Sequence, residues 1–477
     1  MEDTPRTACP ECQRLRQQLA GLQAQVERLS ATVAQLQEQL ARARKDSSTS
    51  SKPPSSDLVK PSKTPPADGA GPRRPGGQPG HPRHQRELFP PELLNGGSHT
   101  HYLELCPTCG YGLRDIGAAP RLVQQVDVES PPLRIEEHRA LAGYCPHCQD
   151  LHYAPLPAGI AHGGLVGPRL TALIAYLKGG CHASYSTIRK FLRDVVRVTL
   201  SRGQLAKVIA KVSQVLDAPY QELLDRLPAE ARLNVDETGH PDGGQRWWTW
   251  CFRAGLYTLF KIDPTRSGDV LLEVLGEEFD GVLGCDYFSA YRRYRRECDV
   301  VVQFCLAHLI RDVKFLTTLP DARDRAYGER LRQALRDLFG VIHRRQELPG
   351  RAFGVALRAA RDAVLRVATV DVPPTRHSRN LAKRFAEHGQ AYFEFVTTPG
   401  VEPTNNLAEQ AIRFVVIDRH VTQGTRGEAG RRWCERIWTV IATCSQQGRS
   451  VFEYLYAAVE AHFHKSGSAP SLLPNES

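Results

Sequence analysis

The stretch RLNVDETGH, residues 232–240, decides which fold this sequence is expected to adopt. Apolar and polar residues alternate up to Asp236, and Gly239 and Pro241 then interrupt the alternation. This pattern predicts a half-buried strand that ends in a carboxylate. The aromatic and β-branched runs RWWTWCFRAG and YTLFKIDPT follow, with a turn around Gly255, and predict the second and third strands of an antiparallel meander.

A second aspartate stands at the end of another predicted strand. The run DGVLGCDYFSAY, residues 280–291, predicts a short strand that ends at Asp286. Neighbouring carboxylates repel each other, so two aspartates at one edge of a sheet are expected to need a divalent cation. Together with a third carboxylate, such a site can hold two metal ions about 3.5 to 4 Å apart and promote phosphoryl transfer.

The third carboxylate is expected from PTNNLAEQAIRFVVIDRH, residues 403–420. Asn405 or Asn406 can cap the first turn of a helix there, which places Glu409 about one turn inside it. Taken alone, Glu409 is better explained as an ordinary N-terminal helix glutamate favoured by the helix dipole. The two aspartates favour the catalytic interpretation, and the competing Glu237 is expected on the opposite face of the sheet from Asp236.

Length and charge limit the class of protein. With 477 residues the chain is long enough for about three domains. A net charge of +10, from 62 Lys and Arg against 52 Asp and Glu, makes nucleic acid the first candidate partner, although many basic proteins bind none. The chain has neither an apolar run of membrane-spanning length nor a signal-peptide core, so a soluble, cytoplasmic protein is expected.

The N-terminal segment 1–45 carries a heptad pattern. Its apolar residues are spaced alternately by four and three: Leu15, Leu19, Leu22, Val26, Leu29, Val33, Leu36 and Leu40. This seam predicts a parallel coiled-coil homodimer, the alternative being a lone amphipathic helix that packs on its own chain. Cys9 and Cys12 precede it and form either half of a zinc site shared by two chains or a metal-free pair.

Two segments of distinct composition follow. Residues 46–90 are rich in Ser, Pro and Gly and predict a disordered basic linker. Four of its arginines could contact DNA phosphates or simply keep the linker soluble: Arg73, Arg74, Arg83 and Arg86. Segment 91–160 has two CxxC pairs that predict a ribbon with one structural Zn²⁺ and no open coordination position: Cys106, Cys109, Cys145 and Cys148.

Segment 161–229 has the pattern of successive helices. Ser184 and Ser201 are expected helix N-caps, and a short break at 197–199 suits a helix-turn-helix. The last helix carries three cations that could contact DNA: Arg202, Lys207 and Lys211. A plain helical bundle explains the same pattern, because no base contact can be tested in the sequence.

Several of these features together resemble a DDE transposase of the insertion sequence 66 family over nearly the whole chain. The shared motifs are KPPSSD, RRPGGQPGH, the paired CxxC ribbon, NVDETG (234–239), CDYFSAY (285–291), CLAHLIRD (305–312) and GVEPTNNLAEQAIR (400–413). The resemblance implies a ribonuclease H-like core, with Asp236, Asp286 and Glu409 as the catalytic ligands of Mg²⁺ or Mn²⁺.

The resemblance also implies a domain arrangement. The core is expected in two parts, 230–305 and 401–445, around an all-α insertion at 306–400 and before a helical tail at 446–477. The insertion could clamp DNA or present a solvated basic face. The expected fold class is therefore multidomain α/β, and accessory proteins encoded by the same element are implied partners.

Two features of the sequence are not explained by the family's catalytic pattern. Several transposase families place a basic residue seven positions after the glutamate, where this chain has Val416, so Arg413 and Arg419 are the candidate DNA contacts. Cys305 and His308 form a CxxH without further ligands nearby in the sequence, which favours a role in orienting DNA or the core over zinc binding.

The predicted function is metal-dependent DNA strand cleavage followed by strand transfer at the ends of a mobile element. The chain has no Walker-type phosphate loop, which agrees with chemistry that needs no nucleotide energy source. Two alternatives stay open: a non-catalytic dimeric zinc-ribbon DNA-binding regulator derived from such an element, and a metal-dependent nuclease that cuts without joining.

Overall fold

The structure is a computed structural model of the chain, and it describes residues 10–46, 49, 90–93, 108, 133–138, 141–145, 147, 150–153, 165–464 and 469–474. The chain divides into two compact units. The first comprises Met1–Pro61, His138–Asp194 and Val198–Ser477, and the second comprises Ser62–Glu137 and Val195–Arg197. The sheet and nearly all described helices belong to the first unit.

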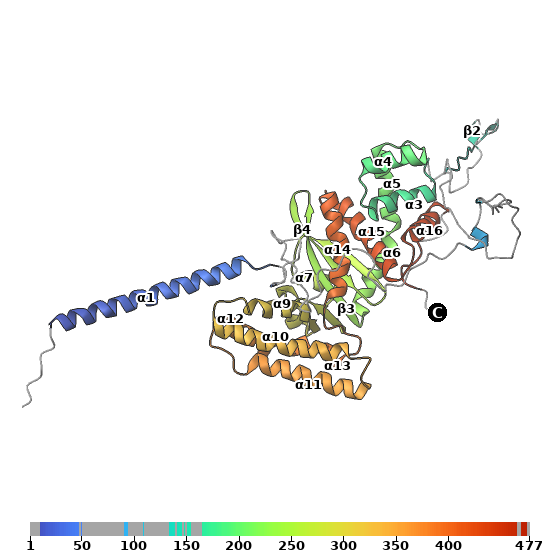
Figure 1. Cartoon of the computed structure of the whole chain (residues 1–477). Helices are drawn as coiled ribbons and strands as arrows, with labels where there is room; N and C mark the ends of the chain where they lie inside the picture. The colour runs from blue at the N-terminus through green and yellow to red at the C-terminus, as the bar shows by residue number, and fades with distance from the viewer. Residues whose placement is uncertain are drawn as a thin grey trace, which may run out of the picture. The chain divides into compact units, whose positions relative to one another are not determined.

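A five-stranded mixed sheet forms the centre of the first unit (Figure 1). Its strands are β3 (Arg232–Asp242), β4 (Gln245–Arg253), β5 (Thr258–Asp263), β6 (Val282–Cys285) and β7 (Val301–Phe304), and their order is β5-β4-β3-β6-β7. The first three strands are antiparallel neighbours, and β6 and β7 are added in parallel on the other side of β3. The α/β class and the meander agree with the sequence-based prediction.

The length of β3 differs from that prediction. Asp236 lies within β3, which runs through Gly239 and Pro241 to Asp242 and turns at Gly243 and Gly244 into β4. Pro241 is tolerated because its backbone faces away from β4: its carbonyl oxygen accepts the Thr425 N–H at 2.9 Å on that outer side. The missing N–H of proline therefore removes no hydrogen bond from the ladder.

The outer edge of β5 is covered by helix α15 (Glu428–Gln446). Three side chains spaced four residues apart on α15 accept hydrogen bonds from alternate N–H groups of β5. The pairs are Ile262 N–H to Glu435 Oε1 at 2.7 Å, Phe260 N–H to Thr439 Oγ1 at 3.1 Å and Thr258 N–H to Thr443 Oγ1 at 3.2 Å. One turn of the helix thus matches two residues of the strand, and the N–H groups at the edge of the sheet find acceptors on α15 without another strand.

Thr439→Val tests this covered edge. Valine keeps the shape but removes the acceptor of a buried N–H, so the free energy of unfolding should fall by about 1 to 3 kcal/mol. Denaturant unfolding measures the change. Thr369→Val is the matched control, because the exposed Thr369 hydroxyl bonds only to the Leu365 carbonyl of its own helix, and it should be nearly neutral. Equal effects of the two substitutions would contradict the edge role.

A helical group packs beside α15. It consists of α3 (Pro168–Gly179), α4 (Tyr185–Phe191), a π-helical turn η3 (Leu192–Val196), α5 (Arg202–Val215), α6 (Asp217–Arg226), η4 (Leu227–Ala229) and α16 (Val451–His464). Ser184 accepts the Thr187 N–H, and Ser201 forms a capping box with Gln204, so both predicted N-caps are confirmed. α5 is surrounded by α3, α4, α15 and α16, as a bundle requires.

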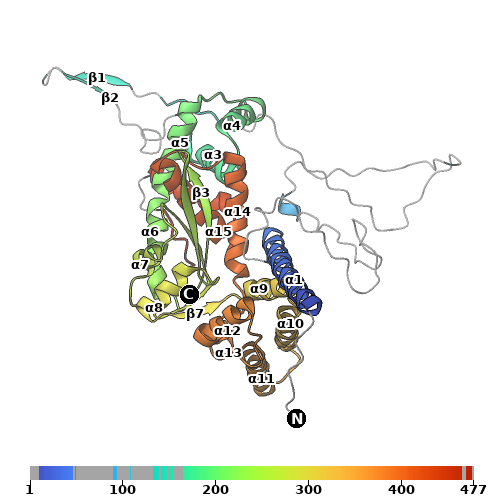
Figure 2. The same cartoon turned by 90° about the vertical axis from the view of Figure 1, so that its left-hand side faces the viewer.

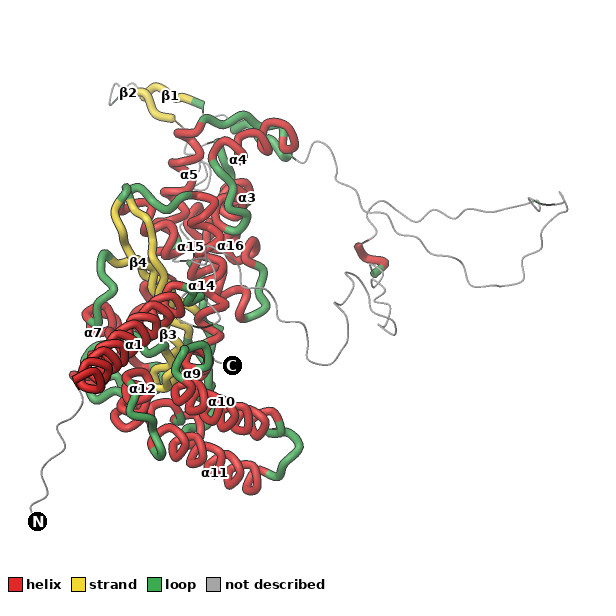
Figure 3. Tube along the Cα trace, turned by 60° about the vertical axis from the view of Figure 1, so that its left-hand side comes forward, coloured by secondary structure: helices red, strands yellow, loops and turns green. Residues whose placement is uncertain are grey.

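The described chain between β7 and Gly400 is helical. The elements are α9 (Leu306–Leu316), α10 (Ala322–His343), α11 (Gly350–Thr369), α12 (Arg376–His388), η5 (Gly389–Tyr392) and α13 (Glu394–Thr397). Long helices α10 and α11 lie side by side (Figure 3). Two shorter helices, α7 (Asp269–Leu275) and α8 (Ser289–Cys298), flank β6 in the sequence.

Helix α14 (Asn406–Thr422) then returns the chain to the sheet and packs against β3 and β4 (Figure 2). It buries Ala408, Ile412 and Val415. Because α14 covers the central strand, it brings residues from near position 409 to residues near position 236.

The remaining described elements are α1 (Pro10–Ala43), η2 (Pro91–Leu93) and the small antiparallel pair β1 (Ala142–Cys145) and β2 (Asp150–Tyr153). The eight seam residues of α1 are 49% to 62% exposed, so the described part of the chain leaves this apolar seam uncovered. None of the described helices combines the length and the apolar character that crossing a membrane requires.

Candidate active site

Asp236 and Asp286 are neighbours across the parallel strands β3 and β6. The register pairs Arg232 with Val282 and Asn234 with Gly284, and two further residues along each chain lead to Asp236 and Asp286. Adjacent strands lie about 4.8 Å apart, and residues at the same level of a parallel pair share a face. Both aspartates are only partly exposed. The predicted pair of carboxylates is therefore brought together in the middle of the sheet, where β6 ends beside β3.

The face of β3 that carries Asp236 is the face that α14 covers. Asn234 donates to Asn405 Oδ1 at 2.9 Å, and Arg419 of α14 donates to Thr238 Oγ1 at 2.7 Å. Side chains at positions 234, 236 and 238 share a face, because successive residues of a strand alternate. Asp236 thus lies between the two points at which the α14 segment is hydrogen-bonded to β3.

Glu237 occupies the other face, as its position next to Asp236 predicted. Its buried carboxylate accepts from Arg266 Nε at 2.7 Å and from the hydroxyl of Tyr291 on α8. The Arg266 guanidinium also stacks over the Phe288 ring at 3.7 Å. Glu237 is therefore held in a buried ion pair and is not available as a third ligand beside Asp236.

Asn405 anchors the start of α14, but not as the helix cap that the sequence suggested. It occupies the N-cap position of α14 without a capping hydrogen bond from its side chain. Its amide instead donates to the Val235 carbonyl at 2.8 Å and accepts from Asn234. The Asn405 N–H donates to Cys305 Sγ at 3.1 Å. One buried asparagine therefore joins α14 to β3 and to the end of β7.

The electrostatics of the carboxylates reflect their closeness. Burial, with the charges of Glu237, Asp286 and Glu409, raises the pKa of Asp236 well above its usual range. Burial and the charge of Glu237 raise the pKa of Asp286 to about 7, although the Phe288 N–H donates to it at 2.8 Å and Arg266 and Arg384 lie near. Both groups are shifted in the direction expected of anions held together without a cation.

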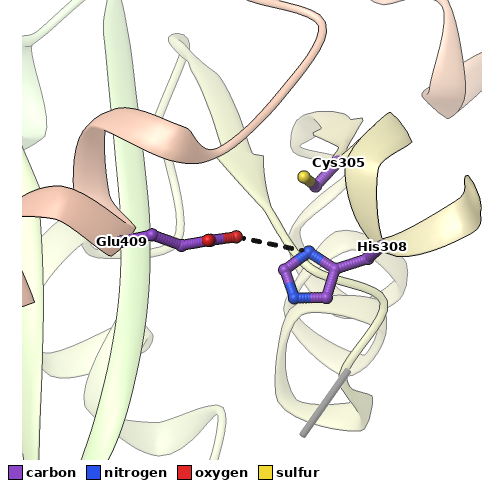
Figure 4. Close-up of side chains that lie close together, drawn as sticks. All are labelled: Cys305, His308 and Glu409. Carbon is purple, nitrogen blue, oxygen red and sulfur yellow. Dashed lines mark ion pairs between the residues drawn. The ribbon is translucent and has the colours of Figure 1, made fainter. Parts of the chain in front are cut away.

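Glu409 lies one helical turn after Asn405 and points toward the start of α9 (Figure 4). Its Oε1 is 3.6 Å from His308 Nδ1, and its Oε2 is 3.9 Å from Arg311. Burial raises the pKa of Glu409, and Arg311 and Arg413 partly offset that shift. The charge of Glu409 thus contributes to the raised pKa of Asp236, while its two carboxylate oxygens lie beside His308 and Arg311 of α9.

Cys305 and His308 stand on the other side of Glu409 (Figure 4). Cys305 is the N-cap residue of α9, and His308 lies within its first turn. Burial lowers the pKa of His308 to about 4 and raises the pKa of Cys305 to about 11. Ligand atoms of Cys305, His308 and Glu409 lie within 4.8 Å of one another, and among the described residues no other set of three His, Cys, Asp or Glu does so.

A basic, aromatic cavity of about 640 Å³ adjoins this part of β3. Thr238, Trp248, Arg266 and Arg419 are among the residues that line it. Two guanidinium groups lie near the Trp248 ring, that of Arg246 at 4.5 Å and that of Arg266 at 4.8 Å from its centre. Cations interleaved with an aromatic ring form a surface suited to a nucleic-acid strand.

The predicted DNA-contact residues are placed differently from one another. Arg202 and Lys207 are exposed on α5, whereas Lys211 packs over the Phe463 ring at 4.7 Å. Arg413 is exposed on α14. Arg419 is partly buried and donates to Thr238 and to the Gly239 carbonyl, so part of its donor capacity is used within the protein.

Other sequence-predicted site residues lie outside the described residues. They are the linker arginines Arg73, Arg74, Arg83 and Arg86, the cysteines Cys9, Cys106, Cys109 and Cys148, and the side chains of Cys12 and Cys145. Their DNA and zinc roles stay predictions.

Sequence reasoning missed three residues of this site: Asn234, Arg311 and Arg384. Asn234 could have been found, because it lies two residues before Asp236 and must share its face in a strand. Arg311 could have been found as the residue nearly one turn after His308 on a helix. Arg384 carries no such local signal, since it reaches the vicinity of Asp286 from α12.

Comparison with known protein families agrees with this arrangement. The model of the transposase IS66 family matches residues 163–432, more than half of the chain, and spans the sheet, the helices after β7 and α14. A family of unknown function (DUF6444) matches residues 2–87. No curated protein matches the chain. Because this match covers more than half of the chain, the chain is a member of the IS66 family of transposases.

Proposed function

We propose that the protein is a DDE transposase that cleaves DNA strands at the ends of its element and joins them to target DNA. The observation that carries the proposal is the meeting of Asp236 and Asp286 on adjacent parallel strands under the helix that holds Glu409. The order of three antiparallel strands followed by two parallel ones supports a ribonuclease H-like core.

The three carboxylates fit Mg²⁺ or Mn²⁺. Carboxylate oxygens are the donors that these hard cations prefer. Burial, together with neighbouring carboxylate charge, raises the pKa of Asp236 and of Asp286, and a bound cation would oppose that shift. When bound, the cation supplies Lewis-acid activation of the attacking oxygen and neutralises the leaving one. Asp236, Asp286 and Glu409 would hold it, and Asn405 would keep Glu409 in place.

Other residues of the chain would bind and orient the DNA. Arg246, Arg266 and Trp248 line the cavity beside β3, where phosphates and an unstacked base could be accommodated. Exposed Arg413 lies one turn after Glu409 on α14, and Arg202 and Lys207 are exposed on α5. We assign these cations to the transposon end or to target DNA.

Synapsis of two element ends would need at least two protomers. The exposed apolar seam of α1 supports a coiled-coil homodimer, because eight exposed Leu and Val side chains on one helix favour burial against a second copy. The four-cysteine ribbon would bind structural Zn²⁺ and help to hold DNA. Accessory proteins from the same element are further proposed partners.

The test incubates the purified full-length protein with labelled element ends, target DNA and Mg²⁺ or Mn²⁺. We expect nicks at the element end and then joined products. Binding without cleavage would overturn the proposal in favour of a regulator. Cleavage without joining would overturn it in favour of a nuclease.

A further inference from the structure

Two buried polar atoms beside the carboxylates have no hydrogen-bond partner among the described residues: His308 Nδ1 and Glu409 Oε1. The His308 side chain is only 9% exposed. Buried polar atoms are nearly always paired, and leaving one unpaired costs about 1 to 3 kcal/mol. The 3.6 Å between these two atoms is too long for a hydrogen bond between them. We therefore expect a bound water molecule or metal ion to interact with both atoms.

The spacing matches two ligands of one metal ion. Zinc bonds of roughly 2.0 to 2.3 Å at tetrahedral angles place neighbouring ligand atoms roughly 3.3 to 3.8 Å apart. The His308–Glu409 separation of 3.6 Å falls in that range, and Cys305 Sγ lies within 4.8 Å of a ligand atom of each of these two residues. A water molecule could pair the two atoms as well, but it would not account for the thiol sulfur that lies within metal-ligand reach of both residues.

The donor set selects the kind of ion. A sulfur, an imidazole nitrogen and a carboxylate oxygen suit zinc and do not suit Mg²⁺, which prefers oxygen alone. Cys305 lies at the N-terminus of α9, and its Sγ accepts the Asn405 N–H at 3.1 Å, so the sulfur is held in place beside the other two side chains. We infer that Cys305, His308 and Glu409 bind a Zn²⁺ ion, in addition to the cation of the proposed function.

This ion would fix the carboxylate on which the proposed function depends. Three protein ligands leave a fourth position on a tetrahedral zinc for water or another oxygen donor. A carboxylate has two oxygens, so binding of Oε1 to zinc leaves Oε2 of Glu409 for the catalytic cation. The zinc inference stands without the proposed function, because metal binding can be measured in the absence of DNA.

The test measures zinc per chain in the purified full-length protein and in the variants Cys305→Ser and His308→Gln, each checked for folding by thermal unfolding. We expect each variant to hold about one zinc fewer than the wild type, whatever the ribbon cysteines bind. Cys444→Ser is the matched control: it removes another buried cysteine, on α15, and should leave the zinc content unchanged. If Cys305→Ser does not fold, His308→Gln gives the same answer with a side chain of similar size.

Equal zinc content in wild type, Cys305→Ser and His308→Gln would overturn the inference. Cobalt substitution gives a second readout: the wild type should show a cobalt–thiolate absorption component that Cys305→Ser lacks, and its persistence in that variant would also overturn it. Asp236→Asn separates the two proposals, because it should abolish cleavage while keeping the zinc content. If cleavage fails in the wild type but the zinc losses appear, the function is wrong and the zinc site stands.

Discussion

Asp286→Asn should reduce strand cleavage by about 10³-fold or more, which corresponds to about 4 kcal/mol of transition-state stabilisation. The amide keeps the size and most contacts of the side chain but removes the negative charge that would hold a divalent cation. The measurement is the single-turnover cleavage rate of a labelled element end in Mg²⁺, with DNA binding measured separately. Binding should persist, because the exposed arginines are unchanged.

The same substitution should not destabilise the metal-free protein at neutral pH. The pKa of Asp286 is raised to about 7, so its ionisation opposes folding as the pH rises from about 4, where the unfolded chain loses this proton, to about 7. An asparagine removes that cost. The melting temperature of the variant in chelator should therefore equal or exceed that of the wild type at pH 7.5, which separates loss of function from loss of fold.

Asp263→Asn is the matched control for this prediction. Asp263 also ends a strand of the sheet, but that strand is β5, and its carboxylate accepts the Thr265 N–H at 2.8 Å. Its replacement should leave the cleavage rate within a few-fold of wild type. A large loss in Asp263→Asn with normal activity in Asp286→Asn would contradict the assignment of the carboxylates.

The strands were predictable because their signals are local. Alternation in 232–236, the aromatic runs and the turn at Gly255 each lie within about ten residues and gave β3, β4 and β5 in the observed order. The predicted end of β3 was wrong, because a proline such as Pro241 normally ends a strand. It is tolerated here only because its backbone faces away from β4. That side is set by Thr425, far along the chain.

Other features of the site depend on contacts that no local pattern contains. Either Asn405 or Asn406 was predicted as a cap, but the Asn405 side chain bonds instead to Asn234, which is 171 residues away. Cys305 and His308 lacked further ligands in the sequence, and Glu409 approaches them from a helix that begins about 100 residues later. The sequence identifies candidate residues from their types and spacing. Which of these residues contact one another depends on how α14 packs on β3.

Asn405→Ala should impair both stability and cleavage. The change leaves the Val235 carbonyl and the Asn234 amide without their buried partner, so the free energy of unfolding should fall by about 2 to 3 kcal/mol. The start of α14 also loses its attachment to β3. A displacement of about 1 Å in a catalytic group can cost about 10²-fold in rate, so the cleavage rate should fall by about tenfold to a hundredfold at temperatures where the variant is still folded.

Asn406→Ala is the matched control, since it removes the neighbouring asparagine, which is exposed at the first position of α14. It should change the free energy of unfolding by less than about 0.5 kcal/mol and leave cleavage nearly normal.

The two variants distinguish an anchor from a cap. If capping were the role of this pair, Asn406→Ala would cost as much as Asn405→Ala, and the loss would be one of helix stability alone. If Asn405 positions Glu409, Asn405→Ala should lower the single-turnover rate at saturating DNA without weakening DNA binding. Unchanged cleavage by folded Asn405→Ala would show that α14 does not need this attachment to present Glu409.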